Sequence, residues 1–258
     1  MARILSDART VSGRRIKVKS RPYSLVSGGG LGNYVNLGAS FVLDTSLPFA
    51  IQVEADLSSY YLTSVVAAGL INLKTDQGVP FLLFMQNTAI ISLKIGGNSI
   101  FPVVVPINPN RRNALFKNGR HEIVIAFDGV DRTAASSYKI YIDGDDLTGG
   151  SGTTPSLTTH VNTLFILGAS SSGRGDISRL RIWNGGTEMT EAQVKNLYYD
   201  DEKPTGPTLV REFLFTDGAG SQVTETVLGD HGTIVGSMTW RTAPLSDRTL
   251  ASARTLSS

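Results

Sequence analysis

Two acidic residues, Glu54 and Asp56, are the best candidates for chemistry because they alternate within the run 49–57. Successive side chains of a β-strand point to opposite faces, so both carboxylates are expected on one face. Retaining glycosidases use two carboxyl groups about 5–5.5 Å apart. The next two positions on this face hold a serine and a tyrosine, so the partner is missing unless another strand supplies Glu122. We therefore expect no enzyme activity and a solvated outer face, with ligand contact as the alternative for Glu54 and Asp56.

Other catalytic and phosphate-binding sets are absent from the sequence. The three histidines are scattered and form no His-x-x-x-His pair for zinc, and the glycines at 28–30 lack a following Lys-Ser/Thr pair. His121 falls in the same register as the apolar residues of its strand. We expect it to be a hydrogen-bonded structural residue and not a base.

A cluster of acids at one hairpin raises the question of a metal. Asp143, Asp145 and Asp146 follow a run of alternating residues, and loop carboxylates suit calcium. However, Asp143-Gly144 is also a strong signal for a tight hairpin turn. We favour the turn and expect no cofactor, with calcium as the alternative.

Exposed aromatic residues are candidates for stacking on sugars. Tyr60 and Tyr61 are expected at a strand end, where they could contact a ligand. Trp183 shares its predicted face with Arg179 and Arg181, and we expect it to cap the core beside a helix.

The N-terminal segment is strongly basic: among its first 21 residues only Asp7 is acidic. We predict a basic arm with a glycine-rich linker over residues 1–30. One interpretation is a solvated arm or a charged edge strand. The other is docking on an acidic partner, through Arg14, Arg15, Lys17, Lys19 and Arg21.

Period-2 alternation predicts the strands that position these residues. It is clearest in Phe49–Leu57, His121–Phe127 and Tyr138–Ile142. Shorter candidates are Val65–Leu73, Pro80–Met85, Ile90–Ile95, Leu164–Leu167, Ile177–Trp183, Val210–Phe215 and Thr233–Trp240. Many short strands with glycine, asparagine, aspartate or proline between them are typical of a sandwich or barrel.

One helix is predicted, at Thr190–Tyr198. Thr190 and Gln193 form a capping box, and Met189 and Val194 occupy the positions of a hydrophobic staple. The helix is short, so it must pack on the sheet to be stable.

Several of these motifs, in this order, resemble the laminin G-like, concanavalin A-like jelly rolls. They are Tyr34–Gly38, Pro48–Val53, Gly119–Gly129, Tyr138–Gly144 and Asp176–Asn184 with the helix that follows. The resemblance implies an all-β antiparallel jelly-roll sandwich with one short helix. Relatives that cut β-glucans carry two glutamates and an aspartate at alternating strand positions, and this chain lacks the second glutamate. Some relatives bind calcium through loop carboxylates.

The resemblance covers residues 33–200. The strands that usually open such a jelly roll resemble Phe213–Gly220 and His231–Trp240, which here follow the helix. We expect a sandwich over residues 31–243, with 205–243 completing it in permuted order, and a polar tail over 244–258. A small appended unit is the alternative.

Composition limits the function classes. The chain has 258 residues, 41% hydrophobic and 18% charged, no cysteine and a net charge of +2. These values indicate a globular protein without disulfides and argue against a nucleic-acid binder. No transmembrane run or signal peptide is evident, so we expect synthesis in a host cytoplasm and no membrane insertion.

Together these features favour a structural or attachment component of a phage particle. It would be a homo-oligomeric tail, fibre or capsid-decorating protein, located in the virion and held to other virion proteins by the basic arm, with the sandwich exposed for adhesion to glycans. The alternatives are a free lectin-like carbohydrate-binding module and, as a weaker hypothesis, a β-glucan hydrolase.

Overall fold

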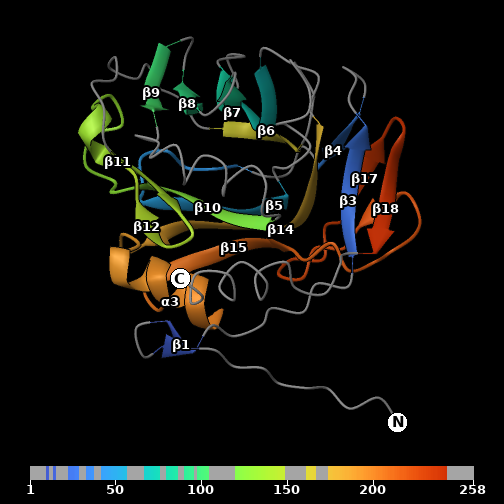
Figure 1. Ribbon diagram of the computed structural model, residues 1–258. Helices are drawn as coiled ribbons and strands as arrows, with labels where there is room; N and C mark the ends of the chain where they lie inside the picture. Colours follow the sequence, from blue (N-terminus) through green and yellow to red (C-terminus); the bar gives the residue numbers. More distant parts are fainter. Residues whose placement is uncertain are drawn as a thin grey trace, which may run out of the picture.

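The computed structural model describes residues 10–11, 14–15, 23–28, 33–37, 42–56, 67–75, 80–86, 90–95, 98–104, 120–148, 161–166 and 174–242. Over these ranges the chain forms two eight-stranded antiparallel sheets, a two-stranded ribbon and one α-helix. The two large sheets and helix α3 (Glu191–Asp200) form successive layers (Figure 1). The predicted all-β sandwich with one short helix is confirmed.

The sheet nearer the helix, here called the helix-side sheet, has the order β12-β11-β10-β5-β14-β3-β18, and β15 also pairs with β14. Its strands are β3 (Tyr23–Gly28), β5 (Phe49–Asp56), β10 (Arg120–Phe127), β11 (Tyr138–Ile142), β12 (Asp145–Asp146), β14 (Arg174–Gly186), β15 (Pro207–Phe213) and β18 (Met238–Thr242).

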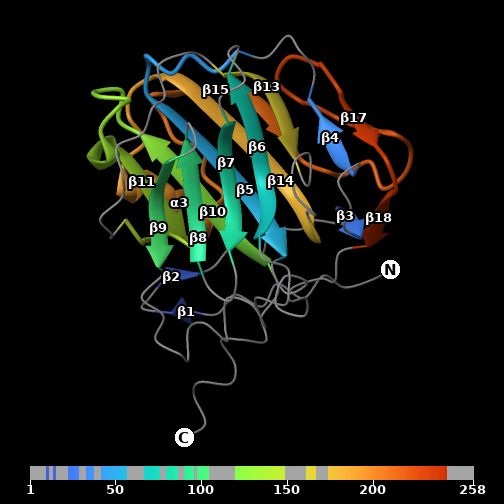
Figure 2. The same cartoon turned by 90° about the horizontal axis from the view of Figure 1, so that it is seen from above.

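The second sheet, here called the opposite sheet, has the order β16-β17-β4-β13-β6-β7-β8-β9. Its strands are β4 (Tyr34–Asn36), β6 (Ala67–Thr75), β7 (Pro80–Gln86), β8 (Ile90–Ile95), β9 (Asn98–Val104), β13 (Val161–Ile166), β16 (Gln222–Val223) and β17 (Gly232–Val235). Strands β6–β9 lie over β5 and β10 when the molecule is viewed from above (Figure 2).

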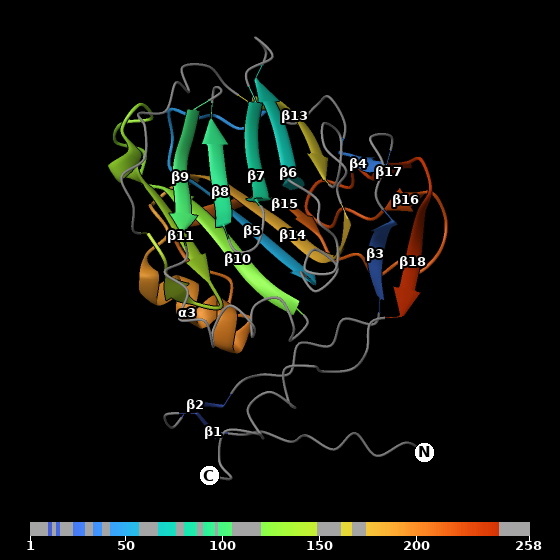
Figure 3. The same ribbon diagram turned by 45° about the horizontal axis from the view of Figure 1, so that its top comes forward.

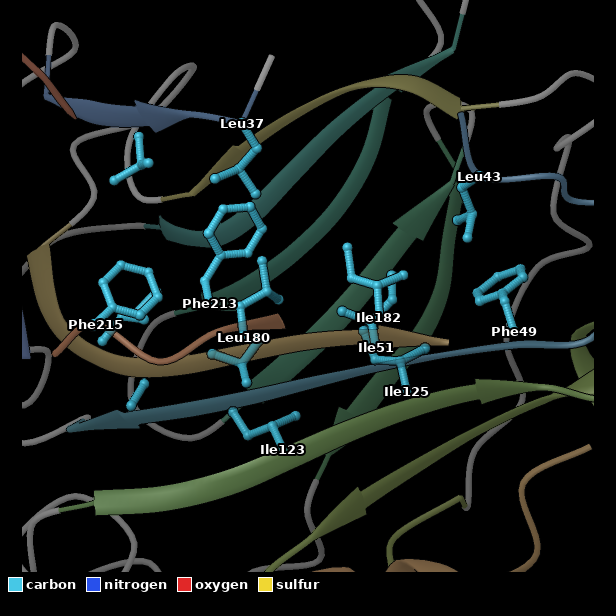
Figure 4. Close-up of a cluster of buried hydrophobic side chains, with 14 of the residues drawn as sticks. Leu37, Leu43, Phe49, Ile51, Ile123, Ile125, Leu180, Ile182, Phe213 and Phe215 are labelled. Carbon is cyan, nitrogen blue, oxygen red and sulfur yellow. The ribbon is translucent and has the colours of Figure 1, made fainter. Parts of the chain in front are cut away.

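The main core lies between the sheets and follows the predicted alternation. Ile51, Ile123, Ile125 and Ile182 from three neighbouring strands are fully buried and cluster together (Figure 4). Near one end of the core, the rings of Phe49 and Phe127 lie 5.1 Å apart. The inward register predicted for β5, β10 and β11 is therefore confirmed.

The sandwich starts earlier than predicted. Strand β3, at Tyr23–Gly28, pairs with both β14 and β18, and its Leu25 is fully buried in the core. The boundary predicted at residue 31 therefore lies too late, because Ser27 and Gly28 belong to a strand and not to a linker. Strands β3 and β18 lie side by side at one edge of the molecule (Figures 1 and 3).

The C-terminal strands join both sheets. In the helix-side sheet, β15 pairs with β14 and β18 pairs with β3. Strands β16 and β17 belong to the opposite sheet. The single strand predicted at Thr233–Trp240 is wrong: β17 ends at Val235, and Gly236, with a φ of 80°, turns the chain toward β18 in the other sheet. Residues 207–242 thus complete the two sheets.

Helix α3 (Glu191–Asp200) begins as predicted. The Thr190 side chain accepts a hydrogen bond from the Gln193 backbone, the Gln193 side chain accepts one from the Thr190 backbone, and Met189 and Val194 pack in one cluster. Figure 3 shows α3 on the face of the helix-side sheet that points away from β6–β9. No helix in the described ranges is long and apolar enough to cross a membrane.

Candidate functional site

The outer face of the helix-side sheet is buried, contrary to the solvated face predicted for it. Gln52 is 0% exposed and Glu54 is 3% exposed. The prediction was wrong because strand alternation shows which residues share a face but not what packs against that face.

Helix α3 covers the apolar half of this face. Trp183 is buried with Val194 and Leu197 of the helix, over the small side chains Ala50 and Ala126 of β5 and β10. Two neighbouring alanines leave room for a helix to approach the sheet closely. The prediction that Trp183 caps the core beside the helix is confirmed, and Trp183 is not available for stacking on sugars.

A chain of ion pairs fixes the end of α3 to the sheet. Asp201, the C-cap of α3, accepts hydrogen bonds from both terminal nitrogens of Arg179 and from Arg181 at 2.9 Å. The Nε of Arg181 donates to Glu212 of β15 at 2.6 Å, and Lys203 donates to the other Glu212 oxygen at 2.9 Å. Charges this deeply buried require such pairing.

Glu54 lies at the inner end of this chain of charges, with its Oε2 3.9 Å from Nε of Arg179. Glu122 is directly opposite Glu54 in the β5–β10 register. The structure thus places Glu54 beside Glu122, the pair of carboxyl groups that the glycosidase hypothesis requires. Glu122 is only 1% exposed, so neither carboxylate is reachable from solvent in this structure.

A second polar group crosses the far end of the same face. In the strand registers Arg120 is opposite Asp56, Asp56 is opposite Asp176, and Ser24 is opposite Arg241. Nη1 of Arg241 lies 3.6 Å from the Asp176 carboxylate. We call this set, Ser24, Asp56, Arg120, Asp176 and Arg241, the polar row.

The polar row contains buried atoms without hydrogen-bond partners: Oγ of Ser24, Nη2 of Arg120 and Oδ1 of Asp176. Burial raises the pKa of Asp176, and Asp56 adds to the rise, whereas Ser24, Arg120 and Arg241 oppose it. The Ser24 hydroxyl acts on the pKa of Asp176, although its Oγ and the Asp176 Oδ1 do not meet in hydrogen-bond geometry. Buried polar groups in proteins are nearly always paired, so three orphans in one place mark a candidate binding site.

Strand alternation predicts only Asp56 of this row on the outer face. Counting alternate residues back from Trp183 puts Ile177 on the outer face and Asp176 in the core. A register shift between Ile177 and Arg179 reverses this, so Ile177 is buried in the core and Asp176 joins the outer face. The spacing of three between the apolar residues Ile177 and Leu180 is the sequence signal of this bulge.

The hairpin aspartates do not converge. Asp143 lies 2.7 Å from Nδ1 of His121 and accepts a hydrogen bond from the Glu122 backbone, while Asp146 accepts one from the Thr148 backbone. Asp145 is exposed. Across the part of the chain that the structure describes, no three histidine or acidic residues are placed to hold a metal ion.

His121 is a hydrogen-bonded strand residue, as predicted. Positive φ angles at Asp143 and Gly144 form the expected tight turn between β11 and β12.

The remaining predicted contacts fall largely outside the described residues. Tyr60 and Tyr61 lie there, as do Lys17, Lys19 and Arg21 of the predicted arm. Arg14 and Arg15 form β2, which pairs with β1 (Thr10–Val11), and the backbone of β2 lies against α3.

The comparisons with known proteins give a fold and no family. No protein-family model matches the sequence, and no curated protein sequence matches it. The structure is similar to that of a candidate carbohydrate-binding protein from Bacteroides ovatus, with a TM-score of 0.52 and 12% identity over 89% of this chain and 63% of that one.

Two sialidases are also similar. A Trypanosoma rangeli sialidase has a TM-score of 0.41 and 11% identity, over 76% of this chain and 32% of that one. The NanB sialidase of Streptococcus pneumoniae has a TM-score of 0.37 and 12% identity, over 63% of this chain and 28% of that one. The chain thus spans less than two thirds of the length of these structures.

Proposed function

We propose that this chain is a non-catalytic, lectin-like carbohydrate-binding module that holds sugar at the polar row. The observation that carries the proposal is the group of unpaired buried polar atoms on Ser24, Arg120 and Asp176. Sugars bind proteins through hydroxyl groups that both donate and accept hydrogen bonds. The polar row offers carboxylates that accept and guanidinium groups that donate.

The likeness of fold to the Bacteroides ovatus protein supports this proposal by analogy. A fold does not fix a function, so the polar row must carry the argument. Arg120 and Asp56 are half-buried and the Arg241 side chain is 58% exposed, so the row reaches the protein surface on either side of the buried Asp176.

Binding is favoured over hydrolysis by the surroundings of the carboxylates. Glu54 and Glu122 are buried, whereas Asp56 and Asp176 have arginines next to them on both sides of the pair. Burial raises the pKa of Asp176, whereas Arg120 and Arg241 oppose the rise and offer the carboxyl positively charged neighbours, which suits a group that accepts hydrogen bonds.

A glycan array probed with the full chain tests the proposal, followed by calorimetry with the strongest ligand. We expect saturable binding and no release of reducing ends. Failure to bind any glycan at high protein concentration would contradict carbohydrate binding. Release of reducing ends that is lost in Asp176→Asn would instead indicate a hydrolase.

Incorporation into a phage particle is the second candidate, and the basic arm favours it. Because β3 belongs to the sandwich, the informative deletion is residues 1–22, which leaves that strand intact. The proposal expects the truncated chain to fold, as judged by an unchanged melting temperature, but to be missing from purified particles. Normal incorporation would refute the anchoring role.

A further inference from the structure

Strand β18 is an open edge of the helix-side sheet. It ends the strand order, and among the described residues its backbone is hydrogen-bonded only to β3. Alternate N–H and C=O groups of an edge strand point away from the sheet and are free to pair with a strand of another chain. Thr239, Arg241 and Thr242 are exposed, and β18 lies on the outside of the molecule beside β3 (Figures 1 and 3). A partner strand therefore has access to this edge.

The other strand edges in the described ranges are protected. Strands β1, β2, β12 and β16 contain two residues each, and those of β12 are exposed aspartates. Strand β9 carries Pro102, which has no N–H to donate. Strand β15 begins at Pro207, and its other end is bridged through Phe213 to Glu225. Short strands, charges, prolines and covering segments all hinder edge-to-edge pairing, so β18 is the exception.

A second copy of this chain offers β18 a matching open edge, namely its own β18. Two such strands can pair antiparallel about Trp240. Met238 then lies opposite the partner's Thr242, and Thr239 lies opposite the partner's Arg241. All five residues of each strand are used. Met238 and Trp240, which pack against the core, stay on the inner face in both copies. The contact is the same for both copies, so it closes as a two-fold dimer and does not extend into a fibre.

The charge of β18 favours this register. Arg241 is the single charged residue of the strand, and here it faces the uncharged Thr239 of the partner. Pairing centred on Arg241 would instead place two arginines directly opposite each other, which destabilises a strand pair. Pairing centred on Trp240 places two aromatic residues opposite each other, which is favourable. A ladder of five residues is small for a protein interface, so the dimer should dissociate on dilution.

We infer that the chain forms a dimer through β18, in which the helix-side sheets of two copies join into one continuous sheet. The dimer does not depend on the proposed sugar binding. It has a consequence for that proposal, because Arg241 belongs to the polar row and both rows then lie on the same face of the joined sheet. Where the row holds sugar, as proposed above, the dimer presents two sites to a repeating glycan and gains avidity.

The test changes the charge at Thr239, which is exposed and faces the partner's Arg241 in this register. Thr239→Lys brings like charges together twice in each dimer, whereas Thr239→Glu brings opposite charges together. Thr233→Lys, at an exposed threonine of β17, is the matched control. Sedimentation equilibrium of the full chain between about 1 μM and about 300 μM measures the dissociation constant. Melting curves establish that the variants are folded.

We expect wild type to shift reversibly to twice the mass of one chain as its concentration rises. Thr239→Lys should weaken the dimer by about fivefold or more, because the repulsion occurs twice. Thr239→Glu and Thr233→Lys should dimerise at least as well as wild type. Hydrogen exchange of wild type gives a test without substitution: the amides of β18 should exchange more slowly at the higher concentration.

Other outcomes would overturn the inference. A chain that stays monomeric over the whole range would refute the dimer and leave the β18 edge to a strand of a different protein. A dimer that Thr239→Lys does not weaken, and that leaves the β18 amides unprotected, would lie on another surface. Equal weakening by Thr239→Lys and Thr239→Glu would refute the register. Masses above that of a dimer would refute closure through β18 alone.

Discussion

Arg179 of β14 donates hydrogen bonds to the carboxylate of Asp201 from both terminal nitrogens of its guanidinium group. Asp201 stands at the C-cap of α3 with a φ of 55°, and it also accepts a hydrogen bond from Arg181. One carboxylate thus pairs with two arginines whose side chains are 1% and 4% exposed. This contact fixes the helix across the outer face of the sheet.

Replacing Asp201 with asparagine should destabilise the protein. The change keeps the residue's tolerance of a positive φ but leaves two buried guanidinium groups short of negative charge, at a cost of about 3 kcal/mol. Urea unfolding at pH 7 measures the loss, and Asp200→Asn should stay within about 0.5 kcal/mol of wild type. A double-mutant cycle with Arg179→Met should show coupling, and additive effects would mean that the pair does not act as described.

Glu212 should make the protein sensitive to acid. Burial alone would raise the pKa of Glu212, but hydrogen bonds from Lys203, Arg181 and Thr226 outweigh it and lower the pKa. A folded-state pKa below the unfolded value of about 4.3 contributes stability above that pH, and this stability is lost as the pH falls through the folded pKa. Glu212→Gln should therefore lower the free energy of unfolding most at pH 7, and by progressively less below pH about 4.

Unfolding free energies measured from pH 7 to 3 check this expectation, with the exposed Glu202→Gln as control. A Glu212→Gln deficit that is the same at every pH would show that the charge of Glu212 is not what stabilises the fold.

Asp176→Asn should stabilise the protein while weakening sugar binding. Burial raises the folded-state pKa of Asp176, so its favourable contribution is present below the unfolded pKa and is lost as the pH rises through the folded one. At pH 7, burial of the ionised carboxylate lowers the free energy of unfolding, and the uncharged amide of asparagine removes this penalty. The melting temperature should rise at pH 7, and the gain should shrink toward pH 4.

A fall in the melting temperature of Asp176→Asn at pH 7 would contradict this account. It would mean that the arginines beside Asp176 stabilise its charge by more than burial penalises it.

Calcium should not bind at the hairpin between β11 and β12. Asp143 is engaged by His121 and by the Glu122 backbone, and Asp146 by the Thr148 backbone, so the carboxylates serve the turn. Calorimetry with calcium should give no heat and no rise in melting temperature. Heat that is abolished in Asp145→Asn would establish the metal site that the sequence left open.

The sequence predicted what depends on local rules. Alternation placed Ile123, Ile125 and Phe127 in the core, and the capping box at Thr190 and Gln193 set the start of α3. Strand β9 was missed because Pro102 interrupts its apolar run. It is the last strand in the order of the opposite sheet, and prolines within sheets are largely confined to such edge strands.

The candidate site depended on features that alternation cannot supply. The bulge beside Ser178 moves Asp176 onto the outer face, and strands β3 and β18, from opposite ends of the chain, add Ser24 and Arg241. The burial of Glu54 likewise results from tertiary packing and from Arg179, which lies 125 residues further along the chain. Of the residues in the polar row, only Asp56 could be assigned to the outer face from the alternation of its own strand.

The most direct test of the central claim is calorimetric titration of wild type and Asp176→Asn with the strongest glycan from the array. Carbohydrate binding at the polar row predicts saturable heat for wild type, affinity weakened about tenfold or more for Asp176→Asn, and a variant that melts higher at pH 7. Equal affinity for the two proteins, or no binding by wild type, would contradict the claim.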